Sequence, residues 1–276
     1  IRDRDEFIQD LPKILDAMDQ PSIDGINTWF VSKAAKELGI KVAISGLGGD
    51  ELFGGYPSFT DVPRWVKHFR IPSRIPFLGD MVRKAGALFL GPNSSLSPKA
   101  LGLVKYGGTY PGAWLLRRGI FMPWELKKML APGFVREGLQ RLEPVEHIDK
   151  TMGSNLAMPF SKVATMEASM YMRNQLLRDS DWAGMAHSLE IRVPLVDATL
   201  LQRMAPLLTA RARIEGKKWL GHSPKNRLPE EIIDRDKTGF TTPISDWLGA
   251  GLHKESGRNH HWSRTWTRHL AAEWCL

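Results

Sequence analysis

The spacing of apolar residues predicts two helices at the start of the chain. Between Phe7 and Met18 apolar side chains recur at helical spacing, which is typical of an amphipathic helix, and Pro21 marks its end. A second helix is predicted from about Ile26 to Leu38, because its apolar residues also fall on one side. Gly39 is expected to end it, since glycine readily adopts the left-handed backbone found after helices.

A short apolar segment then predicts a buried parallel strand. Residues 40–44 are mostly β-branched, and they follow a helix and precede a glycine-rich loop. Helix, strand and glycine-rich loop in this order are typical of an α/β nucleotide-binding unit. Only one such strand is clear in this sequence, whereas a doubly wound sheet needs several. We therefore expect the other strands to lie upstream.

The remainder of the chain predicts helices packed on helices. Residues 57–151 have a helical but irregular pattern with Pro, Trp and basic residues mixed. Further helices are predicted at 170–177, 185–189, 200–207 and 244–248. No internal repeat or low-complexity segment interrupts the sequence.

The predicted fold class is thus mainly α with a remnant of an α/β sheet and a helical C-terminal part. We treat the chain, 1–276, as one partial domain with two parts. Residues 1–56 form the nucleotide-binding α/β remnant, and residues 57–276 form the mainly helical part.

Composition places the chain among ordinary globular proteins. It has 276 residues, of which 42% are hydrophobic and 25% charged. No apolar run approaches the roughly 20 residues that a membrane span needs, and no secretory signal is recognisable. The single cysteine, Cys275, excludes an internal disulfide framework and a cysteine-rich metal site. We expect a reducing, cytoplasmic location.

The formal charge of +8 widens the choice of ligand. A basic chain suits nucleic acid, anionic lipid or a phosphate-rich substrate such as ATP, and a solvated basic surface explains it equally well. The basic residues spread over 64–83, 117–128 and 203–225 rather than forming one block. No zinc-finger, homeodomain or RNA-recognition signature occurs, so nucleic acid is not expected as a partner.

The strongest local signal is the loop 45–56, which has the sequence SGLGGDELFGGY. Its five glycines allow backbone N–H groups to approach an anion, and a helix beginning near Asp50 would direct its positive end there. Asp50 and Glu51 supply oxygen ligands of the kind that Mg²⁺ takes beside phosphates. The alternative is a glycine-rich turn in which Asp50 caps a helix.

Four segments in the same order resemble motifs of the asparagine synthetase family, which are glutamine-dependent amidotransferases. The loop 45–56 resembles S-G-x-G-x-D-E-L-F-G-G-Y, and residues 181–197 (DWAGMAHSLEIRVPLVD) resemble D-R-x-S-M-A-H-x-L-E-V-R-V-P-F-L-D. Residues 216–220 (GKKWL) resemble G-x-K-x-L, and residues 237–244 (KTGFTTPI) resemble K-x-G-F-x-x-P. The resemblance implies the synthetase domain of such a protein, with a PP-loop ATPase sheet of the adenine-nucleotide alpha-hydrolase type.

The resemblance also implies a reaction. In the family, ATP adenylates a carboxylate with release of pyrophosphate, and ammonia then displaces AMP to leave an amide. The reaction serves asparagine biosynthesis or a related amidation, and it needs ATP, Mg²⁺ and groups that stabilise negative charge. The implied partners are a carboxylate substrate (aspartate or another acid), ammonia derived from glutamine, and an N-terminal glutaminase domain of the same full-length chain. A homodimer is a further candidate.

The family's functional residues map onto positions of this chain. Asp50 matches the aspartate that holds Mg²⁺ on the phosphates, and Lys237 matches a catalytic lysine that reaches the phosphates. Asp181 matches an acidic position near the acyl acceptor. Without the resemblance, Lys237 would be a surface lysine and Asp181 a solvated helix acid. The implied nucleotide-binding residues of the loop are Ser45, Gly46, Gly48 and Gly49.

Other residues of the motifs have structural interpretations. His187, Glu190 and Arg192 are expected to be structural, with an Arg–Glu pair anchoring a turn before Pro194. Asp197 is expected to cap the next helix. For Lys217 and Lys218 two interpretations stay open, an approach to phosphate and a basic helix surface.

The sequence departs from the family in what it lacks. No pyrophosphate-binding loop of the S-G-G-x-D-S type occurs, and neither does a glutaminase domain with its amino-terminal cysteine. Both lie upstream in the family, so we expect a fragment, produced by cloning or by proteolysis, that is inactive alone.

Two substitutions within the motifs bear on the substrate. Leu47 stands where asparagine synthetases carry glutamate and β-lactam synthetases carry tyrosine, and leucine cannot take a proton. Trp182 replaces the customary arginine. These changes favour a carboxylate other than aspartate, for example on a cell-surface polysaccharide precursor.

Two alternative functions remain. One is ring closure by an internal amine, as in β-lactam synthetases. The other is a non-catalytic binding or membrane-surface module, which rests on the basic and apolar segment 69–77 and the Trp-rich tail 262–274. The four ordered motifs disfavour it, so we do not expect a membrane contact. The catalytic hypothesis depends on the loop at Ser45 and Lys237 meeting around one triphosphate pocket.

Overall fold

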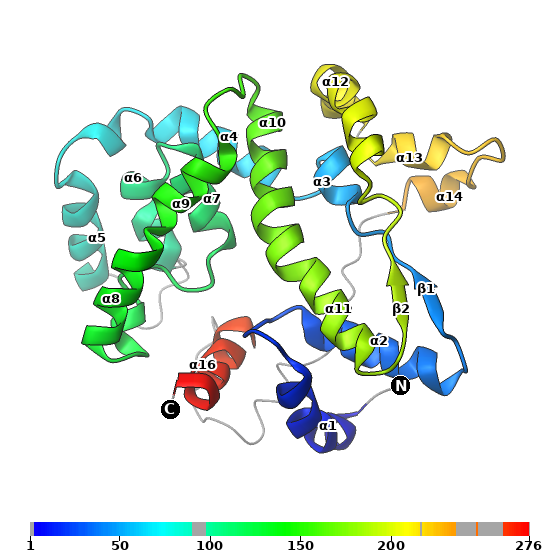
Figure 1. Cartoon of the computed structure of the whole chain (residues 1–276). Coiled ribbons are helices and arrows are strands. Elements are labelled where there is room, and N and C mark those ends of the chain that lie inside the picture. The colour runs from blue at the N-terminus through cyan, green and yellow to red at the C-terminus, as the bar shows by residue number, and fades with distance from the viewer. Residues whose placement is uncertain (1–2, 90–97, 216, 236–246, 248–261, 276) are drawn as a thin grey trace.

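The computed structural model describes residues 3–89, 98–215, 217–235, 247 and 262–275. It confirms a mainly helical fold with one small sheet (Figure 1). The α-helices are α1 (Arg4–Ala17), α2 (Gly25–Glu37), α3 (Gly49–Phe53), α4 (Ser58–Phe69), α5 (Leu78–Phe89), α6 (Leu103–Tyr106), α7 (Tyr110–Arg118), α8 (Pro132–Leu142), α9 (Pro144–Met152), α10 (Pro159–Met166), α11 (Leu177–Met185), α12 (Ala198–Glu215), α13 (Lys218–His222), α14 (Glu230–Ile233) and α16 (Trp262–Cys275). The strands are β1 (Val42–Ile44) and β2 (Glu190–Arg192), short 3-10 turns are η1 (Pro72–Arg74), η2 (Pro98–Gly102) and η3 (Leu126–Lys128), and η4 (Glu167–Leu176) is a π-helix. Among the described helices, none is long and apolar enough to cross a membrane.

The first two helices confirm the prediction from apolar spacing. The side chain of Asp3 caps α1 by accepting a hydrogen bond from the Glu6 backbone N–H at 2.9 Å. After α2 the chain passes through Gly39, whose φ of +74° is the left-handed conformation expected there. The two helices then pack their apolar sides into one core.

The sheet differs from the prediction in two ways. β1 pairs in parallel with β2, and Val42, Ala43 and Ile44 lie opposite Glu190, Ile191 and Arg192 in turn. This second strand was missed, because Glu190 and Arg192 were predicted to anchor a turn before Pro194, and the helix predicted at 185–189 is also wrong. In the structure α11 ends at Met185, and Ser188 then turns the chain with a φ of +55°.

The expected burial of the strand is also wrong. Val42 and Ile44 are exposed, and Ile44 exposes 79% of its surface. Within the described chain β1 has one neighbouring strand, so its other edge and the side chains beside it stay uncovered.

A long continuous helix runs through the middle of the molecule (Figure 1). It comprises α10, the π-helix η4 and α11, and it contains the helix predicted at 170–177. α3 packs against its first half, whereas α11 packs against α2 and β2. π-helical segments are rare and are often found at functional sites.

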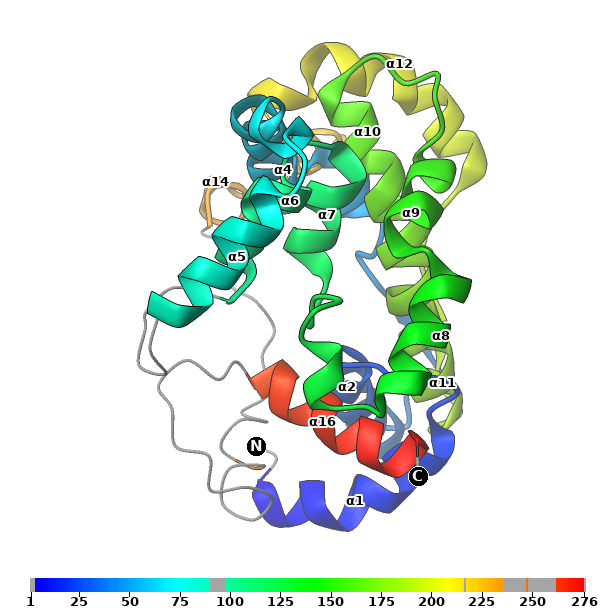
Figure 2. The same cartoon turned by 90° about the vertical axis from the view of Figure 1, so that its left-hand side faces the viewer.

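Three clusters of buried side chains hold the helices together. The first joins α1, α2, α11, α16 and Trp247; the second joins α4, α7, α9 and α10; the third places α3 against α12 and α13. Figure 2 shows α16 lying beside α1 and α2, although these helices come from opposite ends of the chain. The helical patterns predicted for 57–151 and 200–207 are confirmed, and the helix predicted at 244–248 lies outside the described residues except for Trp247.

Candidate functional site

The glycine-rich loop leaves β1 as the sequence predicts and turns into a short helix. The Ser45 backbone N–H donates to the Arg192 carbonyl at 2.8 Å, which ties the loop to β2. The Leu47 N–H donates to the Ser45 hydroxyl at 3.3 Å, and Gly48 then takes a φ of +91°. α3 begins at Gly49, close to the predicted start at Asp50.

Two of the glycines are required by close contacts. A Cβ on Gly48 would lie 2.9 Å from the Leu195 carbonyl oxygen, and a Cβ on Gly55 would lie 1.8 Å from Asp50 Oδ1. Gly46 is different, because among the described residues no atom lies within 4 Å of the position its Cβ would take. The described part of the fold therefore leaves the backbone of this exposed residue accessible to an approaching group.

Asp50 forms an ion pair with Lys217 beside Gly49 and Gly55, where the Lys217 Cε atom lies 3.7 and 3.2 Å from the positions that a Cβ would take on these glycines. Lys217 Nζ lies 2.6 Å from Asp50 Oδ1, and the two side chains are 44% and 17% exposed. Lys218 turns away and pairs with Asp234 on the surface. Of the two interpretations left open for these lysines, the structure places Lys217 at the loop and makes Lys218 part of a basic helix surface.

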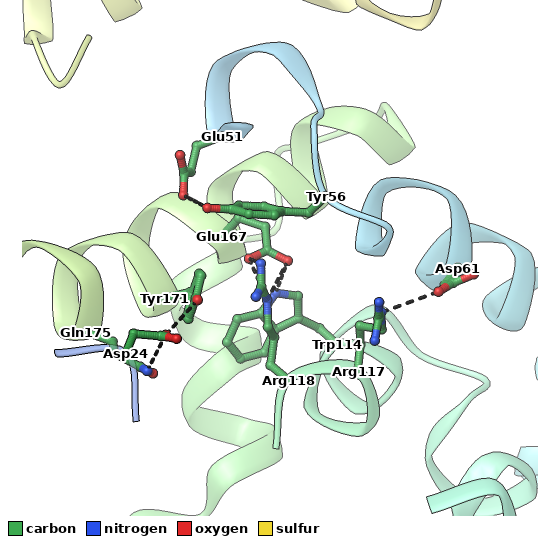
Figure 3. A network of polar contacts seen from close by, with 10 residues as sticks. All are labelled: Asp24, Glu51, Tyr56, Asp61, Trp114, Arg117, Arg118, Glu167, Tyr171 and Gln175. Carbon is green, nitrogen blue, oxygen red and sulfur yellow. Dashed lines mark hydrogen bonds and ion pairs between the residues drawn. The ribbon is translucent and has the colours of Figure 1, made fainter. Parts of the chain in front are cut away.

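Glu51 lies deeper in the protein than Asp50 does. Its side chain is buried, and its Oε1 accepts a hydrogen bond from the Tyr56 hydroxyl at 2.9 Å (Figure 3). Burial raises the pKa of the Glu51 carboxyl, and the nearby charges of Asp50 and Glu167 add to the shift. In this structure one oxygen of Glu51 is thus engaged by Tyr56, and a role of Glu51 as a metal ligand stays a prediction.

The donor set at the loop suits a magnesium ion that is held mainly by phosphates. Within the described residues, no group of three or more His, Cys, Asp or Glu side chains is placed to hold a metal alone. Mg²⁺ commonly takes only one or two protein carboxylates together with substrate phosphates and water. Asp50, half-buried beside Gly49, fits that limited role.

A buried network behind the loop was not predicted from the sequence. The Arg118 side chain makes a two-pronged ion pair with Glu167, with Nε–Oε2 and Nη2–Oε2 distances of 2.9 and 2.6 Å. The guanidinium group also lies over two rings, 3.7 Å from the centroid of Tyr171 and 4.4 Å from that of Tyr56. Since Tyr56 ends the glycine-rich loop, α7 and the π-helix together hold that end (Figure 3).

The network continues to the start of α2. The Tyr171 hydroxyl and the Gln175 amide donate to Asp24 Oδ2 at 2.8 and 2.7 Å. Glu167 additionally accepts from the Trp114 indole N–H at 3.1 Å. Burial raises the pKa of Asp24. The spacing of Glu167, Tyr171 and Gln175, four residues apart along one helix, was the available sequence signal, although it did not indicate partners from α2 and α7.

Of the remaining candidate residues, Asp181 lies apart from the loop and Lys237 is not described. Asp181 is exposed on α11, which packs against α2 and β2, and no described contact joins it to the loop. Its neighbour Asp179 points inward instead and accepts hydrogen bonds from Ser22 and Trp182. Lys237 lies outside the described residues, so its meeting with the loop stays a prediction, as does the role of Asp181.

Trp182, one of the two unusual residues, is part of the core. It is buried against Trp29, and a Cβ on Gly25 would lie only 2.1 Å from its ring. Its indole N–H donates to Asp179 Oδ1 at 3.0 Å. The departure from arginine at this position thus has an explanation in packing.

The structural interpretations of the other motif residues hold with one change. Arg192 and Glu190 form an ion pair at 2.8 Å, but both lie on strand β2 rather than on a turn. Asp197 caps α12, since its Oδ1 accepts from the Leu200 N–H at 2.6 Å. His187 is buried with its ring against Trp29, and burial lowers its pKa.

Comparisons with known proteins agree with this geometry. The family described as Asparagine synthase matches residues 1–263. The chain is 29% identical to the glutamine-hydrolysing asparagine synthetase 1 of Bacillus subtilis (strain 168) over 88% of its own length, and 30% identical over 90% to a Mycobacterium tuberculosis (strain ATCC 25618 / H37Rv) protein named for the same activity. It is also 23% identical over 85% of its length to Amidase chry2 of Gibberella zeae. No solved structure matches.

The match covers only part of these relatives. The chain spans 37% of the length of each of the three. The family match, in contrast, extends over nearly the whole chain and includes the loop, the Asp50–Lys217 pair and the long central helix. The chain belongs to the asparagine synthase family.

Proposed function

We propose that this chain is the synthetase part of an ATP-dependent, glutamine-hydrolysing amidotransferase that adenylates a carboxylate and converts it to an amide. The observation that carries the proposal is the Asp50–Lys217 pair beside Gly49 and Gly55 of the glycine-rich loop. A cation and a carboxylate that are both partly exposed, on a glycine-lined loop, form an arrangement that can bind a phosphate chain with its magnesium ion.

The residues of the loop have separate tasks in this proposal. Ser45, Gly46, Gly48 and Gly49 supply backbone close to the nucleotide, and Asp50 holds the magnesium ion. When phosphate binds, the Lys217 ammonium exchanges its carboxylate partner for phosphate oxygens, because a lysine is a mobile point charge. ATP supplies the activation of the carboxylate. Lys237 adds a second cation, and Asp181 lies toward the acceptor.

The partners follow from the names of the relatives. Two of them are named as glutamine-hydrolysing, so we propose that ammonia comes from a glutaminase domain of the parent polypeptide. The acceptor is aspartate or another carboxylate, and Leu47 favours the latter because its side chain cannot accept a proton. A reducing, cytoplasmic location and a homodimer belong to the same proposal.

Ring closure by an internal amine is the competing reaction. It shares the adenylation step and differs in the source of nitrogen. Glutamine consumption in step with AMP formation supports the amidotransferase, whereas AMP formation and product without any use of glutamine or ammonia would support ring closure.

The test uses the full-length protein that carries this chain. ATP–pyrophosphate exchange with a panel of carboxylic acids measures adenylation directly. Asp50→Asn and Lys217→Met should each lower the exchange rate by on the order of a hundredfold, since each removes a group that acts on the charge of the phosphates. Lys218→Met is the matched control, because this neighbouring lysine pairs with Asp234 away from the loop.

The control should keep the exchange rate of the unmodified protein. Melting temperatures establish that all three variants are folded. Normal exchange in folded Asp50→Asn and Lys217→Met proteins would refute the assignment of the site.

A further inference from the structure

Helix α5 is packed with its faces in the opposite arrangement to that of most surface helices, whose large apolar side chains point toward the core. It turns small residues toward the protein and large apolar residues toward the solvent. A Cβ on Gly79 would lie 2.6 Å from Lys105 Cβ, and a Cβ on Gly86 would lie 2.5 Å from Leu101 Cδ2. Between these glycines Arg83 lies over the Trp124 ring. Residues 79, 83 and 86 therefore form the face that contacts α6, η2 and the Trp124 side chain.

The opposite face carries large apolar side chains that nothing described covers. Phe77, Met81 and Leu88 are spaced four and seven residues apart, so they lie along one side of the helix, and they are 80%, 65% and 85% exposed. Ile71 and Ile75, in the turn that leads into α5, are exposed as well. A contiguous apolar stripe of this kind on a surface marks a site of interaction.

Phe77 is held in a backbone conformation that a bulky residue rarely adopts. Its φ is +63°, and its carbonyl accepts the hydrogen bond from the Met81 N–H at 2.9 Å that begins the helix. Such a conformation is unfavourable for a residue with a Cβ, and no buried packing of the ring offsets it. The strain places an aromatic ring at the end of the exposed stripe.

The segment of the chain that carries the stripe is rich in basic side chains. Between residues 64 and 88 the chain has six Lys or Arg residues and a single acid, Asp80. The Asp80 carboxylate is neutralised by Lys105 at 2.9 Å and by Arg83 at 3.6 Å. The exposed cations Lys67, Arg70, Arg74 and Lys84 are thus left without an acidic counterpart on this segment.

We propose that the exposed face of α5, together with η1, docks on an anionic lipid surface. A helix at a membrane interface combines an apolar stripe with flanking Lys and Arg, which bind anionic headgroups. The core of a protein–protein interface is instead depleted of charged residues. This inference replaces the expectation that the chain makes no membrane contact, and it does not depend on the proposed catalytic function.

The position of α5 argues against additional strands of the sheet as the partner that covers its exposed face. One edge of β1 has no neighbouring strand among the described residues, and this edge lies at the opposite end of the molecule from α5 (Figure 1). An anionic membrane can contact α5 while that edge remains available to other strands.

The test is co-sedimentation of the full-length protein with vesicles. We expect binding to phosphatidylcholine vesicles that contain phosphatidylglycerol, little binding to pure phosphatidylcholine, and weaker binding at high salt. The triple variant Arg70→Gln, Arg74→Gln, Lys84→Gln should weaken binding roughly fivefold for each cation removed. Met81→Gln with Leu88→Gln should weaken it by on the order of tenfold or more.

Matched controls change the same residue types on α12 to α14, at the side of the molecule away from α5. They are Arg203→Gln, Lys225→Gln and Arg227→Gln for charge, and Leu201→Gln with Ile232→Gln for apolar surface, all at exposed positions. These controls should bind vesicles like the unmodified protein. Absence of sedimentation with anionic vesicles would overturn the proposal, and so would equal losses in controls and variants.

Light scattering without lipid tests whether a second copy of the chain, rather than a membrane, covers the α5 face. If the α5 face joins two copies of the chain, the Met81→Gln, Leu88→Gln protein will have half the mass of the unmodified protein. That result without vesicle binding would also overturn the lipid proposal. ATP–pyrophosphate exchange in the same variants should be unchanged, so a failure here is distinguishable from a failure of the proposed catalytic site.

Discussion

Two ion pairs hold the glycine-rich loop, and they differ in exposure and in their surroundings. In one pair Lys217 and Asp50 are 44% and 17% exposed and are joined by one contact. In the other pair Arg118 meets Glu167, which is fully buried, through two contacts and lies against the rings of Tyr56 and Tyr171. One pair can release its cation to a ligand, whereas the other cannot separate without leaving a charge buried.

The difference indicates how one part of the loop can be held in place while a side chain beside it can respond to a ligand. The C-terminal end, at Tyr56, is anchored through the network that reaches α7, α2 and the π-helix. The Lys217 ammonium group, in contrast, lies beside Gly49 and Gly55 and is partly exposed. Four changes test this contrast, and the size of the expected change in stability falls from the first to the last.

Breaking the buried pair should have the largest effect. Arg118→Met leaves the Glu167 carboxylate buried without its cation, and we expect a loss of about 3–5 kcal/mol in the free energy of unfolding. Arg117→Met is the matched control, because the adjacent arginine pairs with Asp61 at 3.3 Å in a half-exposed setting and should contribute at most about 1 kcal/mol. Denaturant unfolding of the full-length protein measures both.

A double variant checks the cause. Arg118→Met with Glu167→Leu removes both charges and should recover much of the loss, since paired buried charges are often replaceable by apolar groups. Similar losses in the double and single variants would show that packing, not the uncompensated charge, sets the stability.

Asp179 is a further buried carboxyl group, and it should make the stability of the protein depend on pH. Burial raises the pKa of Asp179 to about 6, with further contributions from Asp24 and Asp19, although its bonds to Ser22 and Trp182 oppose the shift. The folded protein therefore holds a proton that the unfolded chain has already released between about pH 4 and 6. This carboxyl consequently lowers stability as pH rises through that range.

Asp179→Asn keeps the shape of the side chain without its charge. Between about pH 4 and 7 the difference in the free energy of unfolding between the variant and the unmodified protein should rise in favour of the variant by on the order of 2–3 kcal/mol. Urea unfolding at several pH values measures the difference between the two proteins. A constant difference across the range would contradict the raised pKa.

Tyr56 lies between the two pairs, so removing its hydroxyl should have an intermediate effect. Tyr56→Phe keeps the ring against Arg118 but leaves Glu51 without its hydrogen bond, and we expect a loss of about 1–2 kcal/mol. Tyr171→Phe is the corresponding change at the other ring, where Asp24 keeps its bond from Gln175 and the loss should be smaller. Unfolding by denaturant compares the two, and a larger loss for Tyr171→Phe would reverse the assigned order.

Lys217→Met should change stability least. A partly exposed pair contributes roughly 0–1 kcal/mol, so the melting temperature should remain nearly unchanged while adenylation is lost. This combination distinguishes a cation that acts on a ligand from one that supports the fold. A drop in stability comparable to that of Arg118→Met would remove the contrast between the two pairs.

The features that could be predicted from the sequence are those that depend on residues close together in the chain. Helices α1 and α2, the stop at Gly39, the loop and the Asp197 cap all follow from local spacing and backbone preference. Strand β2 was missed because its three residues, directly before Val193 and Pro194, were predicted as a turn. Its pairing with β1 comes from a segment far away in the sequence.

The candidate site was predicted only in its local part. The loop and Asp50 were found, but nothing local distinguishes Lys217 from Lys218, since the two differ by the direction in which α13 turns them. The network around Arg118 brings together residues from α2, the loop, α7 and η4, and only the packed fold brings these segments together. Lys237, on which the first hypothesis depended, remains a prediction.

The contact between Gly25 and Trp182 has a consequence for how relatives can diverge. The indole ring occupies the volume that any side chain at position 25 would need. Relatives with a large ring at position 182 therefore require glycine at position 25. Relatives with a smaller residue at position 182 can carry other residues at position 25. Across the family these two distant columns should covary, so that mutating either alone is tolerated less well than exchanging both.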